Sequence, residues 1–218
     1  MSRPLLVATR SRGKQEEFRG LLAPLGRPVV FPDDVGLPYS EAEDLLETAD
    51  TFEGNARIKA EWFAVRSGID TVADDSGLEV DALGGAPGVH SKRFAGIDGP
   101  DHEVSAANNA ALLRRLDGVP MELRGARYRC VLVCLALQEF GQPPNGAAGS
   151  SGVGELVVEG VTAGRILEAA VGGGGFGYDP LFLSDELGIS FGEATAAAKG
   201  AVSHRGRAVA ALIRLLTR

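Results

Sequence analysis

Short apolar runs alternate with longer amphipathic segments along the chain. Residues 5–8 form an uninterrupted apolar run that predicts a buried strand. Phe18, Leu21, Leu22 and Leu25 then recur at the spacing of one helix face, which predicts a helix directly after the strand. The chain therefore opens with a strand, a short polar turn and a helix.

The same reading predicts further elements. Strand-like runs, rich in β-branched and aromatic residues, stand at residues 28–31, 71–73, 126–138, 156–161, 165–171 and 180–183. Helical patterns cover a segment that begins at a capping-box-like Asp50 and Glu53 and ends near Gly68, then about 103–116 and 203–216. The acidic residues 32–50 are predicted as a loop. This order indicates an α/β fold with a central sheet and helices packed on it.

The Gly-, Pro-, Ser- and Ala-rich residues 141–154 have the composition of a flexible connection. Because strand-like runs lie on both sides, we interpret this segment as a hairpin loop and not as a domain boundary. A length of 218 residues suits one large domain or two small ones. We therefore predict a single domain over residues 1–218.

Charge narrows the classes of partner. The chain has 22 Lys and Arg against 29 Asp and Glu, a formal net charge of −7. A general nucleic-acid or membrane-surface binder would need a basic field, so neither partner is expected. A local basic pocket for a small anion is compatible with this charge.

The cysteines indicate the compartment. Cys130 and Cys134 lie four residues apart in a predicted strand, a separation of about 13 Å that is too long for a disulfide. Both are expected to pack as small apolar residues, and a reducing cytoplasm is favoured. No apolar run approaches the length of a membrane span.

The first candidate for chemistry is the turn at residues 9–14. Arg10, Arg12 and Lys14 crowd a predicted helix start, where the helix dipole favours anions. A bound phosphate would relieve this repulsion and use the free backbone N–H groups, and Lys14 is expected to meet a phosphate instead of an internal partner. The alternative is a solvated basic turn. The segment is not a Walker A loop, because Gly-x-x-x-x-Gly-Lys-Ser/Thr is absent.

The second candidate follows the strand at residues 71–73. In an extended segment, Asp74 and Asp75 point to opposite faces, so one can face a site while the other is structural. A carboxylate at such a position can hold Mg²⁺ or act as a general base on water. The alternative is a turn in which an Asp caps the backbone near Ser76 and Gly77.

The third candidate is the glycine-rich segment 172–180. It contains a formal Gly-x-Gly-x-x-Gly, but a strand-like run follows where a dinucleotide-binding fold needs a helix, so we reject that fold. Glycines around Phe176 let a flat ring approach the backbone, and an aromatic ring with a nearby Asp suits a nucleobase. The alternative is a mobile loop whose Phe176 and Tyr178 enter the core.

The fourth candidate is Lys199 with the start of the last helix. Ser203 is a plausible N-cap, and His204 and Arg205 again oppose the helix dipole. The alternative is a capped surface helix with incidental basic residues. Two helix starts with cations favour a shared anion. His90 and His102 lack metal-ligand spacing and are interpreted as surface or structural residues.

Five segments together resemble the inosine triphosphate pyrophosphatase (Ham1-like) family, which hydrolyses non-standard purine nucleoside triphosphates. They occur in order over nearly the whole chain: Thr9-x4-Lys14; Thr51-Phe52-x-x-Asn55-Ala56-x-x-Lys59-Ala60; Asp74-Asp75-Ser76-Gly77-Leu78 followed by Gly84-Gly85-Ala86-Pro87-Gly88; Gly174-Gly175-Phe176-Gly177-Tyr178-Asp179-Pro180; and Lys199 with Ser203-His204-Arg205. Each motif is weak alone, and the five in this order are specific.

The resemblance implies a reaction and an architecture. A nucleoside triphosphate (ITP, dITP or XTP) and water would give the nucleoside monophosphate and pyrophosphate, with Mg²⁺ as cofactor, in a homodimer. The implied fold is a long mixed sheet surrounded by helices, in two lobes with the substrate in the cleft between them.

The resemblance also implies roles for individual residues. Asp75 would be the catalytic base and a metal ligand, with Glu47 as a second metal ligand. The substrate would contact Thr9, Arg10, Ser11, Arg12, Gly13, Lys14, Lys59, Ser76, Phe176, Gly177, Tyr178, Asp179, Lys199, His204 and Arg205. Phe176 would stack on the base, and residues 9–14 with Lys59 would hold phosphates. Ser11 departs from the Asn usual in the family and would reach the phosphates through water.

Two other functions compete with this reading. One is a Maf-like pyrophosphatase acting on modified or pyrimidine triphosphates, which a panel of nucleotide substrates separates from the first. The other is a nucleotide-binding module without turnover, which would bind triphosphate and release no pyrophosphate. The presence of Asp75 argues against this module.

Overall fold

A mixed six-stranded sheet organises the protein. The computed structural model describes residues 3–137 and 154–217. The strand order is β2-β1-β3-β4-β5-β6. β1 pairs in parallel with β2 and with β3, and β5 pairs antiparallel with β6. The strands are β1 (Leu5–Val7), β2 (Val29–Val30), β3 (Thr71–Val80), β4 (Gly125–Ala136), β5 (Gly154–Ile166) and β6 (Phe182–Ser184). The predicted mixed sheet with surrounding helices is thereby confirmed.

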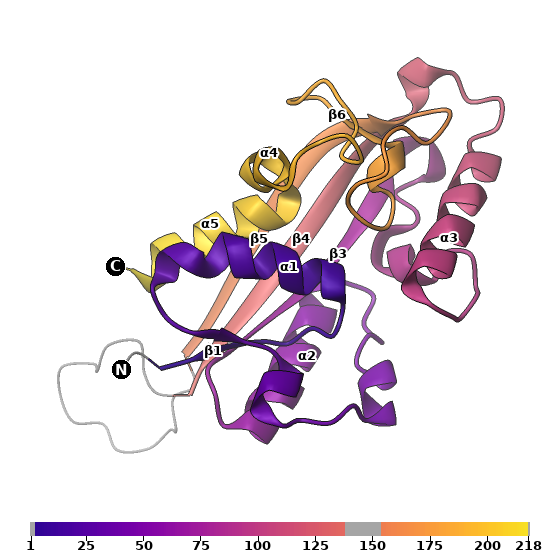
Figure 1. Ribbon diagram of the computed structural model, residues 1–218. Helices are drawn as coiled ribbons and strands as arrows, with labels where there is room; N and C mark the ends of the chain where they lie inside the picture. The colour runs from indigo at the N-terminus through magenta and orange to yellow at the C-terminus, as the bar shows by residue number, and fades with distance from the viewer. Residues whose placement is uncertain (1–2, 138–153, 218) are drawn as a thin grey trace. The chain divides into compact units, whose positions relative to one another are not determined.

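Among the described residues, five α-helices accompany these strands (Figure 1): α1 (Arg12–Leu22), α2 (Phe52–Ser67), α3 (Asp101–Arg115), α4 (Ala196–Val202) and α5 (His204–Leu216). Within the described ranges, none of them is long and apolar enough to cross a membrane. Cys130 and Cys134 are buried free thiols, as expected from their spacing.

The chain forms two compact units. Unit 1 comprises residues 1–75, 131–158 and 211–218, and unit 2 comprises residues 76–130 and 159–210. The division falls inside β3, β4 and β5, so each of these long strands contributes to both units. The prediction of a single domain over residues 1–218 stays a prediction.

In unit 1, two crossover connections place helices on both faces of the sheet. The chain moves from β1 through α1 to β2 in one direction, then through α2 to β3 in the other. Because parallel crossovers are right-handed, the two helices must cover opposite faces. Figure 1 shows α1 and α2 on opposite sides of β1. The small side chains of Ala56, Ala60 and Ala64 let α2 pack closely on Leu6 and Val133.

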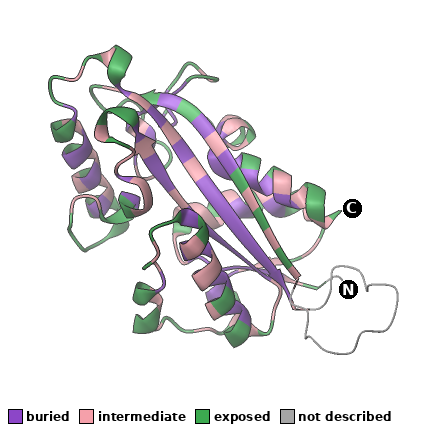
Figure 2. Ribbon diagram, turned by 180° about the vertical axis from the view of Figure 1, so that it is seen from behind, coloured by how far each residue is buried: buried purple, intermediate pink, exposed green. Residues whose placement is uncertain are grey.

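In unit 2, one face of the sheet forms the core. β4 alternates strictly over its first half, where Ala126, Tyr128 and Cys130 are buried and the residues between them are not. Figure 2 shows this change of colour along the strand. Leu78, Leu112, Phe182 and Phe191 join Ala126 and Tyr128 in one apolar cluster, which fixes the segments that follow β5.

Several predicted boundaries were wrong. β3 does not end at residue 73 but continues through Asp74 and Asp75 to Val80, because these carboxylates find cationic partners and the strand need not end in a turn. The runs at 156–161 and 165–171 form one strand that ends at Ile166. A 3₁₀ turn (Asp179–Leu181) replaces the start of the strand predicted at 180–183.

The acidic residues 32–50 contain two 3₁₀ turns, η2 (Pro32–Val35) and η3 (Glu41–Leu45), instead of a plain loop. Helix α2 is capped by Thr51, whose hydroxyl accepts the Gly54 N–H, and not by Asp50. It ends at Ser67, with Gly68 as the C-cap at a φ of 67°, which agrees with the predicted end near Gly68. Most of the predicted hairpin loop at 141–154 lies outside the described residues, but β4 and β5 are neighbours in the sheet.

Candidate active site

Asp74 and Asp75 each form an ion pair with a lysine of a different helix, and these two helices cover opposite faces of the sheet in unit 1. Asp74 Oδ2 lies 2.9 Å from Lys14 Nζ of α1, and Asp75 Oδ1 lies 3.5 Å from Lys59 Nζ of α2. Side chains of consecutive strand residues alternate between faces, so each carboxylate forms its ion pair with the lysine of a different helix. The prediction that Asp74 and Asp75 point to opposite faces is confirmed.

Asp75 belongs to a group that we call the carboxylate–lysine cluster: the buried Asn55, Lys59 and Asp75 and the partly exposed Glu47. Lys59 Nζ donates to Glu47 Oε1 at 2.8 Å and also faces Asp75. Helix α2 places Asn55 and Lys59 one turn apart on its buried face, next to the alanines that pack on the sheet. One ammonium thus lies beside two carboxylates.

Burial and charge act against each other in this cluster. Burial raises the pKa of Asp75 above its ordinary value, although Lys59 and Lys14 lower it. Burial alone would lower the pKa of Lys59, but Glu47, Asp75 and Asp74 outweigh that effect and raise it. Lys59 is therefore charged, and Asp75 is a more basic carboxylate than a solvated one, as a general base for water requires.

Asn55 is a site residue that our sequence analysis missed. Its Nδ2 donates to Asp75 Oδ2 at 3.0 Å, and its Oδ1 accepts the Ala49 N–H at 2.8 Å. Because a backbone N–H can only donate, the amide orientation is fixed and Nδ2 must face Asp75. The signal in the sequence was the spacing of Asn55 and Lys59, which placed both on one face of a helix.

The cluster suits a divalent cation in the chemistry of its donors. Mg²⁺ is usually held by one or two carboxylates together with water and substrate phosphates. Asp75 and Glu47 supply two such carboxylates beside the same lysine. Across residues 3–137 and 154–217, no group of three or more His, Cys, Asp or Glu forms a metal cage. Two carboxylates are a set that a divalent cation can share with water and phosphate oxygens.

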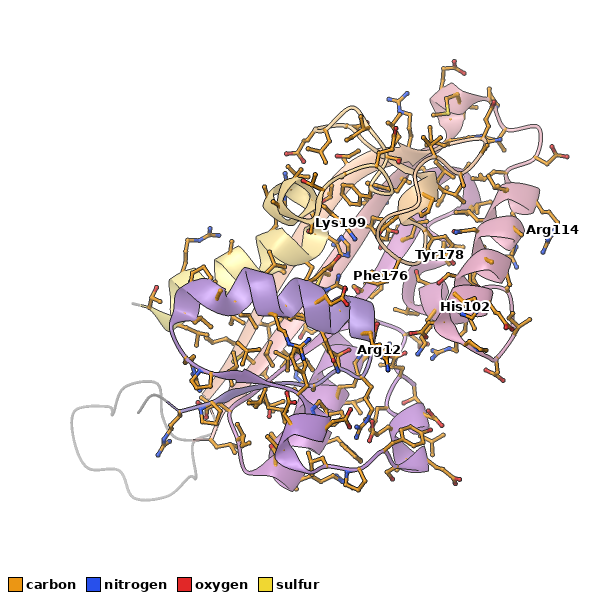
Figure 3. All side chains as sticks on the ribbon, viewed as in Figure 1. Arg12, His102, Arg114, Phe176, Tyr178 and Lys199 are labelled. Carbon is orange, nitrogen blue, oxygen red and sulfur yellow. The ribbon has the colours of Figure 1, made fainter. Side chains whose placement is uncertain are left out.

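In the turn at residues 9–14, two of the three cations pair with carboxylates of the protein, whereas we expected them to be unpaired. Arg10 pairs with Asp33 and Glu43, and Lys14 pairs with Asp74, so the expectation that Lys14 lacks an internal partner was wrong. Arg12 is exposed at the start of α1 (Figure 3) and, within the described ranges, makes no ion pair. Mutual repulsion among these three cations is thus offset mainly by protein carboxylates.

The backbone of this turn is locally fixed. Thr9 Oγ1 accepts the Ser11 N–H at 3.3 Å, and the Thr9 carbonyl accepts a hydrogen bond from Gln15 Nε2 at 3.1 Å. Ser11 occupies the N-cap position of α1, but its side chain accepts no N–H group from the described part of the helix. Arg12 and Gly13 lie in the first turn, where main-chain N–H groups have no acceptor within the helix, and such groups suit an anion.

Unit 2 contains a second group, which we call the aromatic–basic cluster. It consists of Ser76, Phe176, Gly177, Tyr178, Asp179, Lys199, His204 and Arg205. Asp179 lies at its centre: Oδ2 accepts Lys199 Nζ at 2.6 Å and the Phe176 N–H at 2.8 Å, and Oδ1 accepts the Tyr128 hydroxyl at 3.4 Å. Asp179 and Lys199 are both buried. The pair fixes the glycine-rich loop to helix α4.

The glycine-rich loop is shaped by close contacts to Asp179. Gly175 has a φ of 71°, and a Cβ there would lie 2.1 Å from Asp179 Oδ2. Gly177 has a φ of 63°, and its carbonyl accepts a hydrogen bond from Asn109 Nδ2 of α3 at 3.1 Å. Tyr178 is buried and donates to the Ser91 carbonyl at 2.8 Å. Glycine is required at 175 for both backbone and space.

Two cations face the Phe176 ring. Lys199 Nζ lies 4.9 Å and Arg205 Cζ 5.8 Å from its centroid, and Figure 3 shows Lys199 next to Phe176. The Phe176 ring is half-buried, so it is neither fully packed in the core nor fully exposed to solvent. Arg205 is buried and donates from Nη2 to Ser76 Oγ at 2.9 Å. The alternative in which both Phe176 and Tyr178 enter the core holds only for Tyr178, which is buried in the apolar cluster of unit 2.

The start of α5 matches the prediction of a capped helix. Ser203 Oγ accepts the Gly206 N–H at 3.1 Å, the bond expected of an N-cap. The His204 ring stacks on Tyr128 with centroids 4.6 Å apart. Tyr128, which contacts both His204 and Asp179, was missed because it reads as an ordinary strand aromatic. His90 and His102 are exposed, as expected; Figure 3 labels His102 on α3.

Comparison with known proteins identifies the family. The sequence profile of the Ham1 family matches residues 5–215. The chain belongs to the Ham1 family. A dITP/XTP pyrophosphatase of Methylococcus capsulatus is 42% identical over 97% of this chain and 95% of its own length. Another, of Geobacillus kaustophilus, is 44% identical over 95% of this chain and 91% of its own length.

Solved Ham1 structures share the fold. The Ham1 protein of Coxiella burnetii superimposes with a TM-score of 0.78 at 30% identity, covering 99% of both chains. A dITP/XTP pyrophosphatase of Mycobacterium abscessus superimposes with a TM-score of 0.68 at 40% identity, covering 96% of this chain and 98% of that one. The resemblance inferred from the five motifs is confirmed by these matches.

Proposed function

We propose that this Ham1-family chain is a nucleoside triphosphate pyrophosphohydrolase that converts non-standard purine nucleoside triphosphates, such as dITP, ITP and XTP, to the monophosphate and pyrophosphate. The relatives that match over nearly their full length are dITP/XTP pyrophosphatases. The observation that carries the proposal is Asp75, a buried carboxylate with a raised pKa that faces a charged lysine and a second carboxylate.

In the proposed reaction, Asp75 removes a proton from water as the water attacks the α-phosphorus. The bond from the α-phosphorus to the oxygen bridging the α- and β-phosphates breaks, and pyrophosphate leaves with that oxygen. Lys59 neutralises charge on the phosphates, and Asn55 keeps Asp75 Oδ2 occupied so that Oδ1 faces the reacting groups. Thr9, Ser11, Arg12, Gly13 and Lys14 bind phosphate oxygens in the same proposal.

We assign base recognition to the aromatic–basic cluster. Phe176 stacks on the purine, because an exposed ring face binds any base without reading its edge. Arg205, His204 and Lys199 supply donors, which suit the 6-oxo group of inosine and xanthine and oppose the 6-amino group of adenine. Asp179, with Gly177 and Tyr178 beside it, holds the loop that carries Phe176, and Ser76 orients Arg205.

Relatives of this kind generally need a divalent metal, and we propose Mg²⁺ held by Asp75 and Glu47. When bound, the ion would neutralise phosphate charge and polarise the phosphorus–oxygen bonds. We also propose a homodimer in the cytoplasm, on the basis of the family resemblance and the two buried free thiols.

Release of pyrophosphate in the presence of Mg²⁺ tests the proposal across ITP, dITP, XTP, ATP, GTP and dTTP. We expect turnover of ITP, dITP and XTP well above that of ATP and GTP. A preference for dTTP would favour the Maf-like alternative. Binding of ITP without release of pyrophosphate would favour a non-catalytic module and overturn the proposal.

A further inference from the structure

The guanidinium of Arg10 is almost fully engaged inside unit 1. Nε and Nη2 donate to the two carboxylate oxygens of Glu43 at 2.7 and 2.8 Å. Nη1 donates to Asp33 at 2.5 Å, and Nη2 also donates to the Leu37 carbonyl at 3.0 Å. A guanidinium has five N–H groups, so these four bonds leave one for any other ligand.

All three partners belong to one acidic segment, which we define as residues 33–47. Glu43 is itself part of the segment's structure, because its Oε1 accepts the Ser40 N–H at 3.2 Å and completes a capping box of η3. The segment carries six carboxylates, at positions 33, 34, 41, 43, 44 and 47. A cation that pairs with two of them offsets their mutual repulsion and gives the segment a fixed shape.

The segment ends at Glu47 of the carboxylate–lysine cluster. Three residues separate Glu43, held by Arg10, from Glu47, held by Lys59. Leu46 between them is buried in the apolar cluster beneath α2. The position of Glu47 is therefore set from both sides, by the Arg10 pair before it and by the Ala49–Asn55 hydrogen bond after it.

We propose that Arg10 is a positioning residue that holds the acidic segment and thereby places Glu47 beside Lys59 and Asp75, and that it does not bind the triphosphate directly. To reach a phosphate, Arg10 would have to give up a bidentate carboxylate pair, which is among the strongest side-chain interactions. The kinetic part of this inference rests on the proposed function. The structural part does not.

Hydrogen exchange on the protein without nucleotide or metal tests the structural part. Arg10→Gln should speed amide exchange across residues 33–47 by about tenfold, because opening of the segment no longer breaks a charge-assisted pair. Arg27→Gln is the matched control: the Arg27 side chain is 20% exposed, against 22% for Arg10, and pairs with Asp70 in the same unit. It should leave residues 33–47 unchanged. Equal exchange in the two variants would overturn the inference.

A double-mutant cycle tests the kinetic part. If Arg10 acts through Glu43, then Arg10→Gln and Glu43→Ala should each raise the Mg²⁺ concentration for half-maximal rate by a similar factor of about three to ten, and the double variant should be no worse. Arg10→Lys should not restore it, because lysine cannot form the bidentate pair.

Direct phosphate binding gives a different result. Arg10→Gln would then raise KM for ITP, whereas Glu43→Ala would release two N–H groups of Arg10 and leave KM unchanged or lower, and that outcome would overturn the inference. If the wild-type chain releases no pyrophosphate from any nucleotide, the proposed function fails, and the exchange experiment still decides whether Arg10 holds the segment.

Discussion

Asp74 and Asp75 have the same side chain and adjacent positions, yet their surroundings differ. Asp74 pairs directly with Lys14 at 2.9 Å. Asp75 lies farther from its lysine: Asp75 Oδ1 is 3.5 Å from Lys59 Nζ, which also pairs with Glu47. Asp75 also accepts a hydrogen bond from Asn55. The tighter pair suits a structural carboxylate, and the looser one leaves an oxygen available for a proton.

Asp75→Asn should lower kcat by more than a hundredfold, because the amide keeps the size of the carboxylate but cannot accept a proton from water, and general-base catalysis contributes about 10²–10⁴-fold. The fold should persist, since Lys59 keeps Glu47 as a partner. Rates of pyrophosphate release and circular dichroism measure the two effects.

Asp74→Asn is the control for this prediction, since it makes the same chemical change on the other face. It should cost less than tenfold in kcat. A loss in Asp74→Asn equal to that in Asp75→Asn, or an Asp75→Asn variant with more than a tenth of wild-type kcat, would remove Asp75 from the role of base.

Base selection separates stacking from hydrogen bonding. Phe176→Ala should lower kcat/KM for ITP and for ATP alike, because stacking does not distinguish purines. Arg205→Ala should narrow the gap between the two substrates, because a mispaired buried polar group costs about 1–3 kcal/mol, or roughly 10- to 100-fold. The comparison needs kcat/KM for both nucleotides in both variants. If Phe176→Ala erases the preference and Arg205→Ala keeps it, shape selects the base.

For single residues, the sequence predicted the face to which a side chain points better than it predicted the residue with which that side chain pairs. Alternation along an extended chain was enough to send Asp74 and Asp75 to opposite faces. The partner of Lys14 and the bridge made by Asn55 depend on how α1 and α2 cross the sheet, which residue spacing does not contain. The pairing of Arg10 with Glu43, across 33 residues of sequence, had no local signal either.

Among the elements, the glycine-rich loop was recognised from its composition, but the structure that follows it was predicted incorrectly. The loop does not lead into a strand at once but into a 3₁₀ turn that starts at Asp179. That turn brings the Asp179 carboxylate back onto the Phe176 N–H. Local propensity favoured a strand over residues 180–183, and the buried pair with Lys199 outweighed it.

Gly175→Ala should destabilise this loop, and Gly173→Ala should not. A Cβ at 175 would strike Asp179 Oδ2 and force a non-glycine residue to a φ of 71°, whereas a Cβ at 173 meets nothing within 4 Å. We expect Gly175→Ala to cost about 1–3 kcal/mol of stability and to raise KM. Thermal unfolding and steady-state kinetics of both variants measure this. Equal behaviour of the two would mean that the Asp179 contact does not shape the loop.

Over the whole molecule, stability at alkaline pH depends on the buried thiol of Cys134 as well as on the apolar clusters. Burial, with a smaller effect from Asp70, raises the pKa of Cys134 from 9.0 to about 12. The unfolded chain therefore loses this proton at a lower pH than the folded one. The contribution is complete below about pH 9 and is lost as pH rises toward 12.

Cys134→Ala should flatten the decline of unfolding free energy above pH 9, because one thiol contributes up to about 1.4 kcal/mol per pH unit in that range. Val133→Ala, a neighbouring buried truncation without a titrating group, should lower stability at all pH values and keep the slope. Urea unfolding between pH 7 and 11 measures both. A slope in Cys134→Ala equal to that of the wild type would contradict the prediction.

Because Asp74 and Asp75 must face opposite sides of β3, it matters whether a change in the length of this strand is by an odd or an even number of residues. Loss or gain of one residue within the strand ahead of Asp74 would turn Asp75 toward α1 and Asp74 toward α2, since each side chain would change face. A change of two residues would restore the original facing. Viable length variants of this strand should therefore differ by even numbers, and a library of insertions within residues 71–73, screened for pyrophosphate release, should return active chains only in that series.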